Sequence, residues 1–102
     1  MNVSVSEIHV LLGAEIELQT VFDLQPTLQR GEAFNRLAQS AFQQLARHPH
    51  SGGRFLNSSF RRLVLAPTCY ALFYQVEGRR VMVHALLDLR QDPEAIRRRL
   101  GL

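Results

Sequence analysis

The sequence contains no lysine, a single cysteine and no apolar run longer than a few residues. Because the lone thiol of Cys69 has no internal partner, a disulfide-stapled scaffold is excluded and a reducing compartment, the cytoplasm, is expected. A membrane-spanning helix needs about 20 predominantly apolar residues, so none is expected here. The first residues lack the basic segment and the apolar core of a signal peptide, which predicts that none is present.

Arginine is the only strongly basic residue, and its distribution along the chain is uneven. Residues 1–46 hold two arginines against five acidic residues, which gives a net charge of −3. Residues 47–102 hold ten arginines against four acidic residues, which gives +6. Arginine keeps its charge and offers a planar fork for carboxylates or phosphates. The basic half therefore suits an acidic protein segment or a nucleic-acid backbone, although genome composition alone would explain the missing lysine.

The chain length of 102 residues and the hydrophobic content of 46% predict one domain over residues 1–102 with its own core. Residues 5–12 read as a first strand. From Gly13 the apolar spacing changes to that of a helix, and Pro26 is expected to end this helix. A second helix should end before Pro49, and the two helices should form a helical hairpin. The apolar stripe of the second helix consists of Phe34, Leu37, Ala38, Ala41, Phe42 and Leu45.

The second half of the chain reads as three strands and a final helix. The strands are expected at residues 60–65, 68–76 and 79–87, and a tight turn at Glu77-Gly78 joins the last two. Asp92 is suited to cap the final helix, with Pro93 at its first position, Glu94 in its first turn and three arginines in its last turn, all favourable places for these residues. The predicted order is β-α-α-β-β-β-α, which is an α+β protein.

The expected turn fixes which side chains of the last two strands share a face. Tyr74 would lie opposite Val81, and Tyr70 opposite Ala85, on the face that also holds Leu72 and Val83. The other face would carry Ala71, Phe73, Met82, His84 and Leu86. Both faces are largely apolar, yet the helical hairpin can cover only one of them. We therefore expect the second face to be covered by another element or to form a docking surface.

Four motifs of the second half match, in order, those of a known family. Residues 48–52 (His-Pro-His-Ser-Gly) are similar to a Pro-x-x-Gly loop after the second helix, and residues 60–63 (Phe-Arg-Arg-Leu) to an R-x-L strand. Residues 70–78 are similar to the family's hairpin, and residues 83–93 to its closing strand with an Arg-Asp-Pro ending. The chain thus resembles the ParE/RelE superfamily of bacterial type II toxins. The resemblance implies a RelE/ParE-like fold, with the helical hairpin packed on a small, curled, mainly antiparallel sheet.

The resemblance implies a toxin of a type II toxin–antitoxin, or plasmid stabilisation, system that binds a cognate antitoxin as a hetero-oligomer. Toxins of the ParE branch are thought to poison DNA gyrase, whereas those of the RelE branch cut mRNA on the ribosome. RNA cleavage needs a proton acceptor, but no Tyr, His, Lys or Cys follows His84, and arginine is a poor base. Asp88 also replaces the histidine of many ParE-like sequences. We favour a gyrase-binding toxin that is not an enzyme; the alternatives are a RelE-like endonuclease and a non-toxic binding module.

Six arginines are candidates for binding a target or partner. They are Arg61, Arg62, Arg79, Arg90, Arg97 and Arg98. In the nuclease alternative, Arg61 and Arg90 would hold phosphate. Neighbours on a strand point to opposite faces, so one of Arg61 and Arg62 is expected to pair with a carboxylate of the protein and the other to reach a ligand. Arg90 could pair with Asp88 or Asp92. No cofactor or metal is expected, because no Cys, Asp or Glu lies close to His48 and His50.

Overall fold

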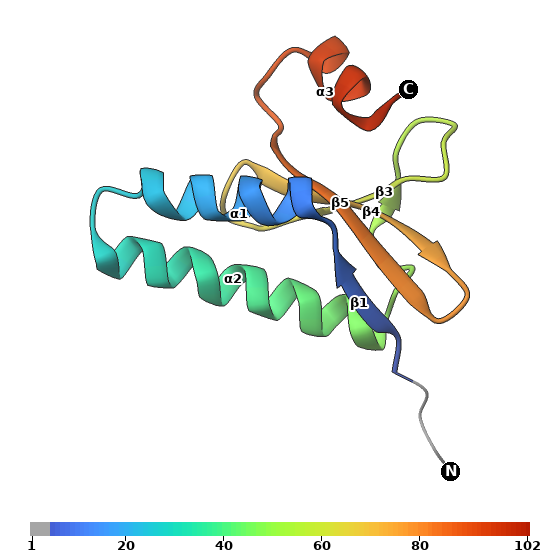
Figure 1. The fold of residues 1–102 in the computed structure, drawn as a ribbon, viewed down its shortest axis with the longest axis horizontal. Coiled ribbons are helices and arrows are strands. Elements are labelled where there is room, and N and C mark those ends of the chain that lie inside the picture. The colour runs from blue at the N-terminus through green and yellow to red at the C-terminus, as the bar shows by residue number, and fades with distance from the viewer. Residues whose placement is uncertain (1–4) are drawn as a thin grey trace.

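A computed structural model describes residues 5–102 of the chain, and within them three helices and five strands (Figure 1). In chain order these are β1 (Glu7–Val10), α1 (Leu12–Leu24), α2 (Leu28–Arg47), β2 (Gly53–Arg54), β3 (Arg61–Val64), β4 (Tyr70–Glu77), β5 (Arg80–Asp88) and α3 (Pro93–Leu100). None of the helices in the described range is long and apolar enough to cross a bilayer.

The strands form one sheet in the order β1-β5-β4-β3-β2, and this sheet is mainly antiparallel as expected. Only β1 runs parallel to its neighbour, β5. The α+β class is confirmed, but the expected order lacked β2. This strand pairs Gly53 with Arg62 and Arg54 with Arg61 at the edge of the sheet. Two residues are too few to show the alternation that marks a strand, so the sequence pattern could not reveal it.

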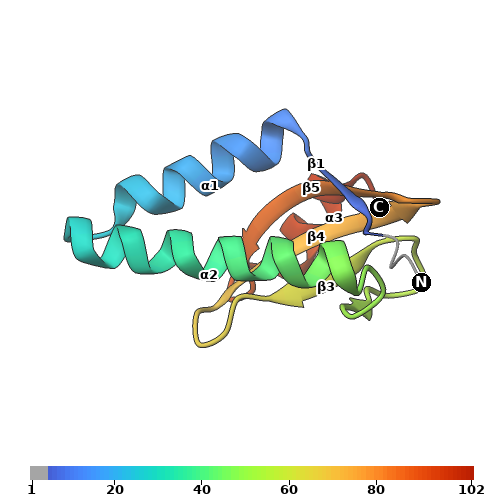
Figure 2. The same cartoon turned by 90° about the horizontal axis from the view of Figure 1, so that it is seen from below.

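The helical hairpin of α1 and α2 covers one face of the sheet, and the two helices diverge from their turn toward β1 (Figure 1, Figure 2). The predicted stripe of α2 is confirmed. Its buried members are Phe34, Ala38, Ala41 and Leu45, which join Leu72, Tyr74, Val81 and Val83 of the sheet in the larger core. Pro26 follows the end of α1 as predicted, and the Thr27 hydroxyl caps α2 by accepting a hydrogen bond from the backbone N–H of Arg30 (3.1 Å).

Helix α3 covers the opposite face of the sheet. It begins as predicted at Asp92, whose carboxylate accepts a hydrogen bond from the backbone N–H of Glu94 (3.0 Å). Ile96 and Leu100 of this helix pack against Phe60 and Phe73 in a second, smaller core. We expected this face either to be covered by another element or to form a docking surface. Helix α3 covers it, so the docking surface is wrong.

The pairing of β4 with β5 differs from the expected register because of the turn and of a β-bulge. The two turn residues are Gly78 and Arg79 rather than Glu77 and Gly78, and Gly78 adopts a φ of 59° that glycine tolerates. Farther along, Tyr74 pairs with Val83 but Phe73 pairs with Ala85, which leaves His84 as the extra residue of the bulge.

Beyond the bulge the two faces of β5 exchange. Ala85 lies in the α3 core and Leu86 in the core beneath the helical hairpin, the reverse of the expected assignment. An inserted residue shifts the alternation by one, so every later side chain changes side.

Side chains from both helical layers satisfy the backbone groups that the bulge releases. The Glu17 carboxylate on α1 accepts a hydrogen bond from the Leu86 N–H (3.2 Å), and the Arg99 guanidinium on α3 donates to the His84 carbonyl (2.9 Å). Arg99 and Glu17 also form an ion pair at 3.0 Å. This cluster, which includes one of the terminal arginines, thus holds the three layers together at the bulge.

The imidazole of His84 should make the protein less stable as the pH falls below neutrality. Its Nε2 is buried and has no hydrogen-bond partner among residues 5–102, and the ring packs edge-on against Phe60 at a centroid distance of 5.1 Å. Burial, and then the charge of Arg99, lowers the pKa of His84, while Glu77 opposes this shift. The unfolded chain therefore binds more protons than the folded one as the pH drops through about 6.5.

We expect the free energy of unfolding of the wild type to decrease between pH 7 and pH 5 more steeply than that of His84→Phe, as measured by urea titration. His50→Gln, at an exposed histidine, should retain the wild-type slope. Equal slopes for wild type and His84→Phe would show that His84 does not cause the acid sensitivity.

Candidate target-binding site

Arg61 is held by the loop that follows α2. Its Nη1 donates hydrogen bonds to the carbonyls of Gly52 (2.8 Å) and His50 (3.3 Å), not to a carboxylate. The buried hydroxyl of Tyr74 accepts a hydrogen bond from the Gly52 N–H (2.9 Å) beside it. Burial raises the pKa of Tyr74, and the Gly52 hydrogen bond and the Arg61 charge act in the opposite direction. Arg61 therefore fastens residues 48–52 to the sheet, and only its remaining donors can reach a ligand.

The loop can approach the sheet this closely because residue 52 is glycine. A Cβ at Gly52 would lie 2.6 Å from the Tyr74 hydroxyl and 2.7 Å from the Arg62 carbonyl. A Cβ at the neighbouring Gly53 would meet nothing within 4 Å. Close packing against the sheet therefore requires glycine at position 52, the glycine of the Pro-x-x-Gly pattern, but not at position 53.

Arg54, Arg61 and Arg62 lie together on β2 and β3, and we call this group the arginine edge. Arg54 is the register partner of Arg61, so two like charges face each other on one side of an antiparallel pair. Arg62 projects from the other side and is exposed. Within residues 5–102 no carboxylate forms an ion pair with any of the three. The arginine edge can therefore bind an anionic partner that lies along the rim of the sheet.

Arg90 forms an ion pair with Asp88, one of the partners that the sequence offered. Its Nη2 and Nε donate to the Asp88 carboxylate at 2.8 and 3.1 Å, and its backbone N–H donates at 2.8 Å. These hydrogen bonds hold the pKa of Asp88 far below its usual range. The Arg90 side chain nevertheless remains 74% exposed, so part of it faces solvent. The carboxylate of Asp88 offsets most of its attraction for a further anion.

The other three candidates are scattered over the molecule. Arg79 lies in the turn between β4 and β5. Arg97, 3.8 Å from Glu94, borders a hollow of about 430 Å³ beside the loop at residues 56–58. Arg98 is exposed on α3 and has no ion pair among the described residues.

The six arginines predicted from the sequence consequently do not form a single site. Strands rise about 3.3 Å per residue, so Arg79 and Arg90, beyond the two ends of the nine-residue β5, are on the order of 30 Å apart. Arg61 is paired through Tyr74 with Val83, which puts it roughly 20 Å from Arg90 along the strand direction. Because each of these two is also hydrogen-bonded within the protein, they are poorly placed to hold one phosphate together.

Arg54 was missed from the sequence, because its strand was not predicted. The only available signal was its place next to Gly53, just after the Pro-x-x-Gly loop. Of possible metal ligands, no group of three or more His, Cys, Asp or Glu comes together in the described range.

Solved structures with a similar fold come from toxin–antitoxin complexes. A chain of the chromosomal ParDE TA system from P. aeruginosa matches with a TM-score of 0.73 at 12% identity, over 85% of this chain and 99% of that one. A chain of the toxin–antitoxin complex RelBE2 from Mycobacterium tuberculosis matches with a TM-score of 0.62 at 16% identity, over 85% and 94%. The protein therefore has the RelE/ParE-like fold that the sequence motifs implied. No protein-family model matches the sequence, and no curated protein is significantly similar to it.

Proposed function

We propose that this protein is the toxin of a bacterial type II toxin–antitoxin system, that it acts in the cytoplasm and that a cognate antitoxin neutralises it. The fold shared with chains of two toxin–antitoxin complexes carries this proposal. Our candidate for the toxic contact is the arginine edge, whose guanidinium groups form no ion pair with a carboxylate of residues 5–102. A rim of guanidinium groups suits an acidic protein surface or a phosphate backbone.

DNA gyrase is the target we favour, and the action is binding rather than cleavage. The nuclease alternative needs Arg61 and Arg90 at one phosphate together with a proton acceptor. Their separation, the hydrogen bonds that hold them and the buried position of the His84 Nε2 argue against that arrangement. The likeness to a RelBE2 chain is the observation that keeps the nuclease as a second candidate.

Controlled expression in a sensitive bacterial host tests the proposal. Growth should arrest with induction of the SOS response, and co-expression of the antitoxin, to be sought in the adjoining gene, should restore growth. Purified protein should inhibit supercoiling by gyrase. Normal supercoiling together with codon-level cuts in ribosome-bound transcripts would favour the nuclease instead. Harmless expression without any antitoxin would indicate a non-toxic binding module.

A further inference from the structure

Helix α1 exposes large apolar side chains on its outer surface. Leu12, Ile16, Thr20 and Leu24 follow one another at intervals of four and form one ridge along the helix. Leu12 is 71% exposed, Ile16 57% and Leu24 69%. The hydroxyl of Thr20 donates to the Ile16 carbonyl (2.8 Å), so the helix itself satisfies this polar group. Apolar side chains gathered in this way on the surface indicate a contact with another molecule.

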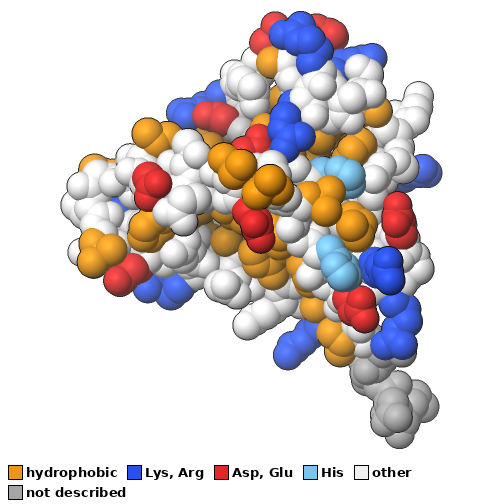
Figure 3. All heavy atoms as spheres, in the orientation of Figure 1, with side chains coloured by type: hydrophobic (Ala, Val, Ile, Leu, Met, Phe, Trp, Pro, Cys, Tyr) orange, Lys and Arg blue, Asp and Glu red, His pale blue; other side chains and the backbone are white. Residues whose placement is uncertain are grey.

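An acidic ridge runs beside the apolar one. Glu15, Gln19 and Asp23 are also spaced by four, and the Gln19 amide donates to the Asp23 carboxylate at 2.9 Å. In Figure 3, acidic side chains border the hydrophobic ones on the helical part of the surface. Neither Glu15 nor Asp23 forms an ion pair with a residue of the described chain. The outer face of α1 is thus apolar with a negative flank, although the whole chain carries a net charge of +3.

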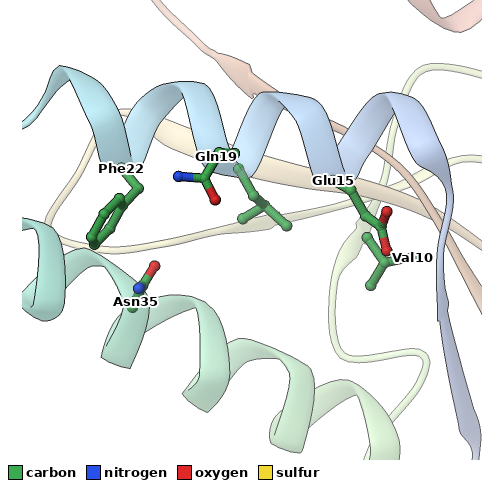
Figure 4. Close-up of a pocket in the computed structure, with 6 residues that line it drawn as sticks. Val10, Glu15, Gln19, Phe22 and Asn35 are labelled. Carbon is green, nitrogen blue, oxygen red and sulfur yellow. The ribbon is translucent and has the colours of Figure 1, made fainter.

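A hollow of about 320 Å³ opens between α1 and α2 on the acidic flank (Figure 4). Leu18, Phe22 and Val10 form its apolar walls, and Glu15, Gln19 and Asn35 supply polar groups. This lining matches a long basic side chain, which packs an apolar stem and presents a charged tip. The hollow therefore favours an arginine or lysine of a partner, with its tip at the Glu15 carboxylate.

Antiparallel pairing of α1 with α1 of a second copy is disfavoured by charge. If α1 packed on α1 about a two-fold axis in antiparallel fashion, Glu15 of each helix would approach Asp23 of the other. Like charges brought together at an interface disfavour the pairing. A partner helix with basic residues on the matching flank would satisfy both ridges.

We propose that the outer face of α1 binds an amphipathic helix of the antitoxin, in which lysine or arginine flanks the apolar stripe and one such side chain enters the hollow at Glu15. The inference rests on the proposed function, since it assigns this surface to the partner that neutralises the chain. It also predicts that the antitoxin has two differently charged contacts: a basic helix on α1, and an acidic segment wherever it covers the arginine edge.

The test measures the affinity of the purified product of the neighbouring gene by titration calorimetry. Glu15→Arg should weaken binding about tenfold or more, because it sets like charges against each other in the hollow. Replacing Leu12 and Ile16 together by Gln, which keeps a good helix former, should weaken it about a hundredfold. Glu32→Arg on α2 and Leu28→Gln beyond the ridge are the matched controls, and both should bind like the wild type. Thermal unfolding of each variant verifies that the fold is retained.

The outcomes separate this inference from the proposed function. Wild-type affinity in Glu15→Arg, or tighter binding, would overturn the basic partner. Self-association of the chain alone, abolished by the Leu12 and Ile16 substitutions in sedimentation experiments, would assign the ridge to a second copy and also overturn it. If the wild type itself did not bind the neighbouring product, the toxin–antitoxin pairing would fail, and the inference with it.

Discussion

Gly52→Ala should lower the free energy of unfolding by about 2–4 kcal/mol, through overpacking and the loss of a buried hydrogen bond. The new methyl group would meet the Tyr74 hydroxyl and the Arg62 carbonyl at less than 3 Å, so the loop has to move away from the sheet. That movement would also break the hydrogen bond from the Gly52 N–H to Tyr74. Urea titration of the purified variants measures the effect.

Gly53→Ala is the matched control for this prediction. Its Cβ would meet nothing within 4 Å and its φ is not in the left-handed region, so the change should stay within about 0.5 kcal/mol. If Gly52→Ala fails to fold, Tyr74→Phe provides a second measurement. It keeps the ring but leaves the buried Gly52 N–H without an acceptor, which should cost about 1–3 kcal/mol. Equal stability of the two alanine variants would contradict the close approach of loop and sheet.

Reversing the charge of Arg54 and Arg62 together, by Arg54→Glu and Arg62→Glu, should abolish growth arrest. Each guanidinium supplies a charge-assisted contact, so each reversal should weaken target binding by about tenfold or more. Both side chains are exposed and take part in no ion pair of the described residues, so the free energy of unfolding should change by no more than about 1 kcal/mol. Growth after induction and inhibition of gyrase supercoiling by the purified variant are the two measurements.

Arg30→Glu together with Arg36→Glu, an equal change of charge at two exposed positions of α2, is the control and should remain toxic. Arg61 is unsuitable for this experiment, because it holds the loop at residues 48–52 and its loss would affect folding. Full toxicity of the variant with both reversals would move the target contact away from the arginine edge, and Arg79 and Arg98 would be the next arginines to replace.

Most helices and strands could be predicted because their signals are local. The stripe of α2 repeats over 20 residues, and Pro26 and Asp92 act on the backbone next to them. The bulge at His84 and the turn at Gly78-Arg79 were mispredicted because several registers satisfy the same apolar alternation. The choice among them depends on partners distant in sequence, such as Glu17 and Arg99, which accept and donate at the released backbone groups.

The sequence predicted that arginines would make up the candidate site, but not which arginines lie together or where. Composition indicated an arginine-rich binding surface, and the ordinary pairing of Arg90 with Asp88 follows from two positions only two residues apart. The hydrogen bonds from Arg61 to loop carbonyls, and the position of Arg54 opposite Arg61, depend on the pairing of β2 with β3 at the edge of the sheet.

The sequence by itself thus determined the α+β class, the helical hairpin, the strand hairpin and the uneven charge, because propensity, capping and periodicity act within a few residues. Only the tertiary structure decided which face α3 covers, which arginines remain free and that α1 exposes an apolar ridge. These features depend on which surfaces of segments distant in sequence bury each other, and that is determined only when the whole chain packs.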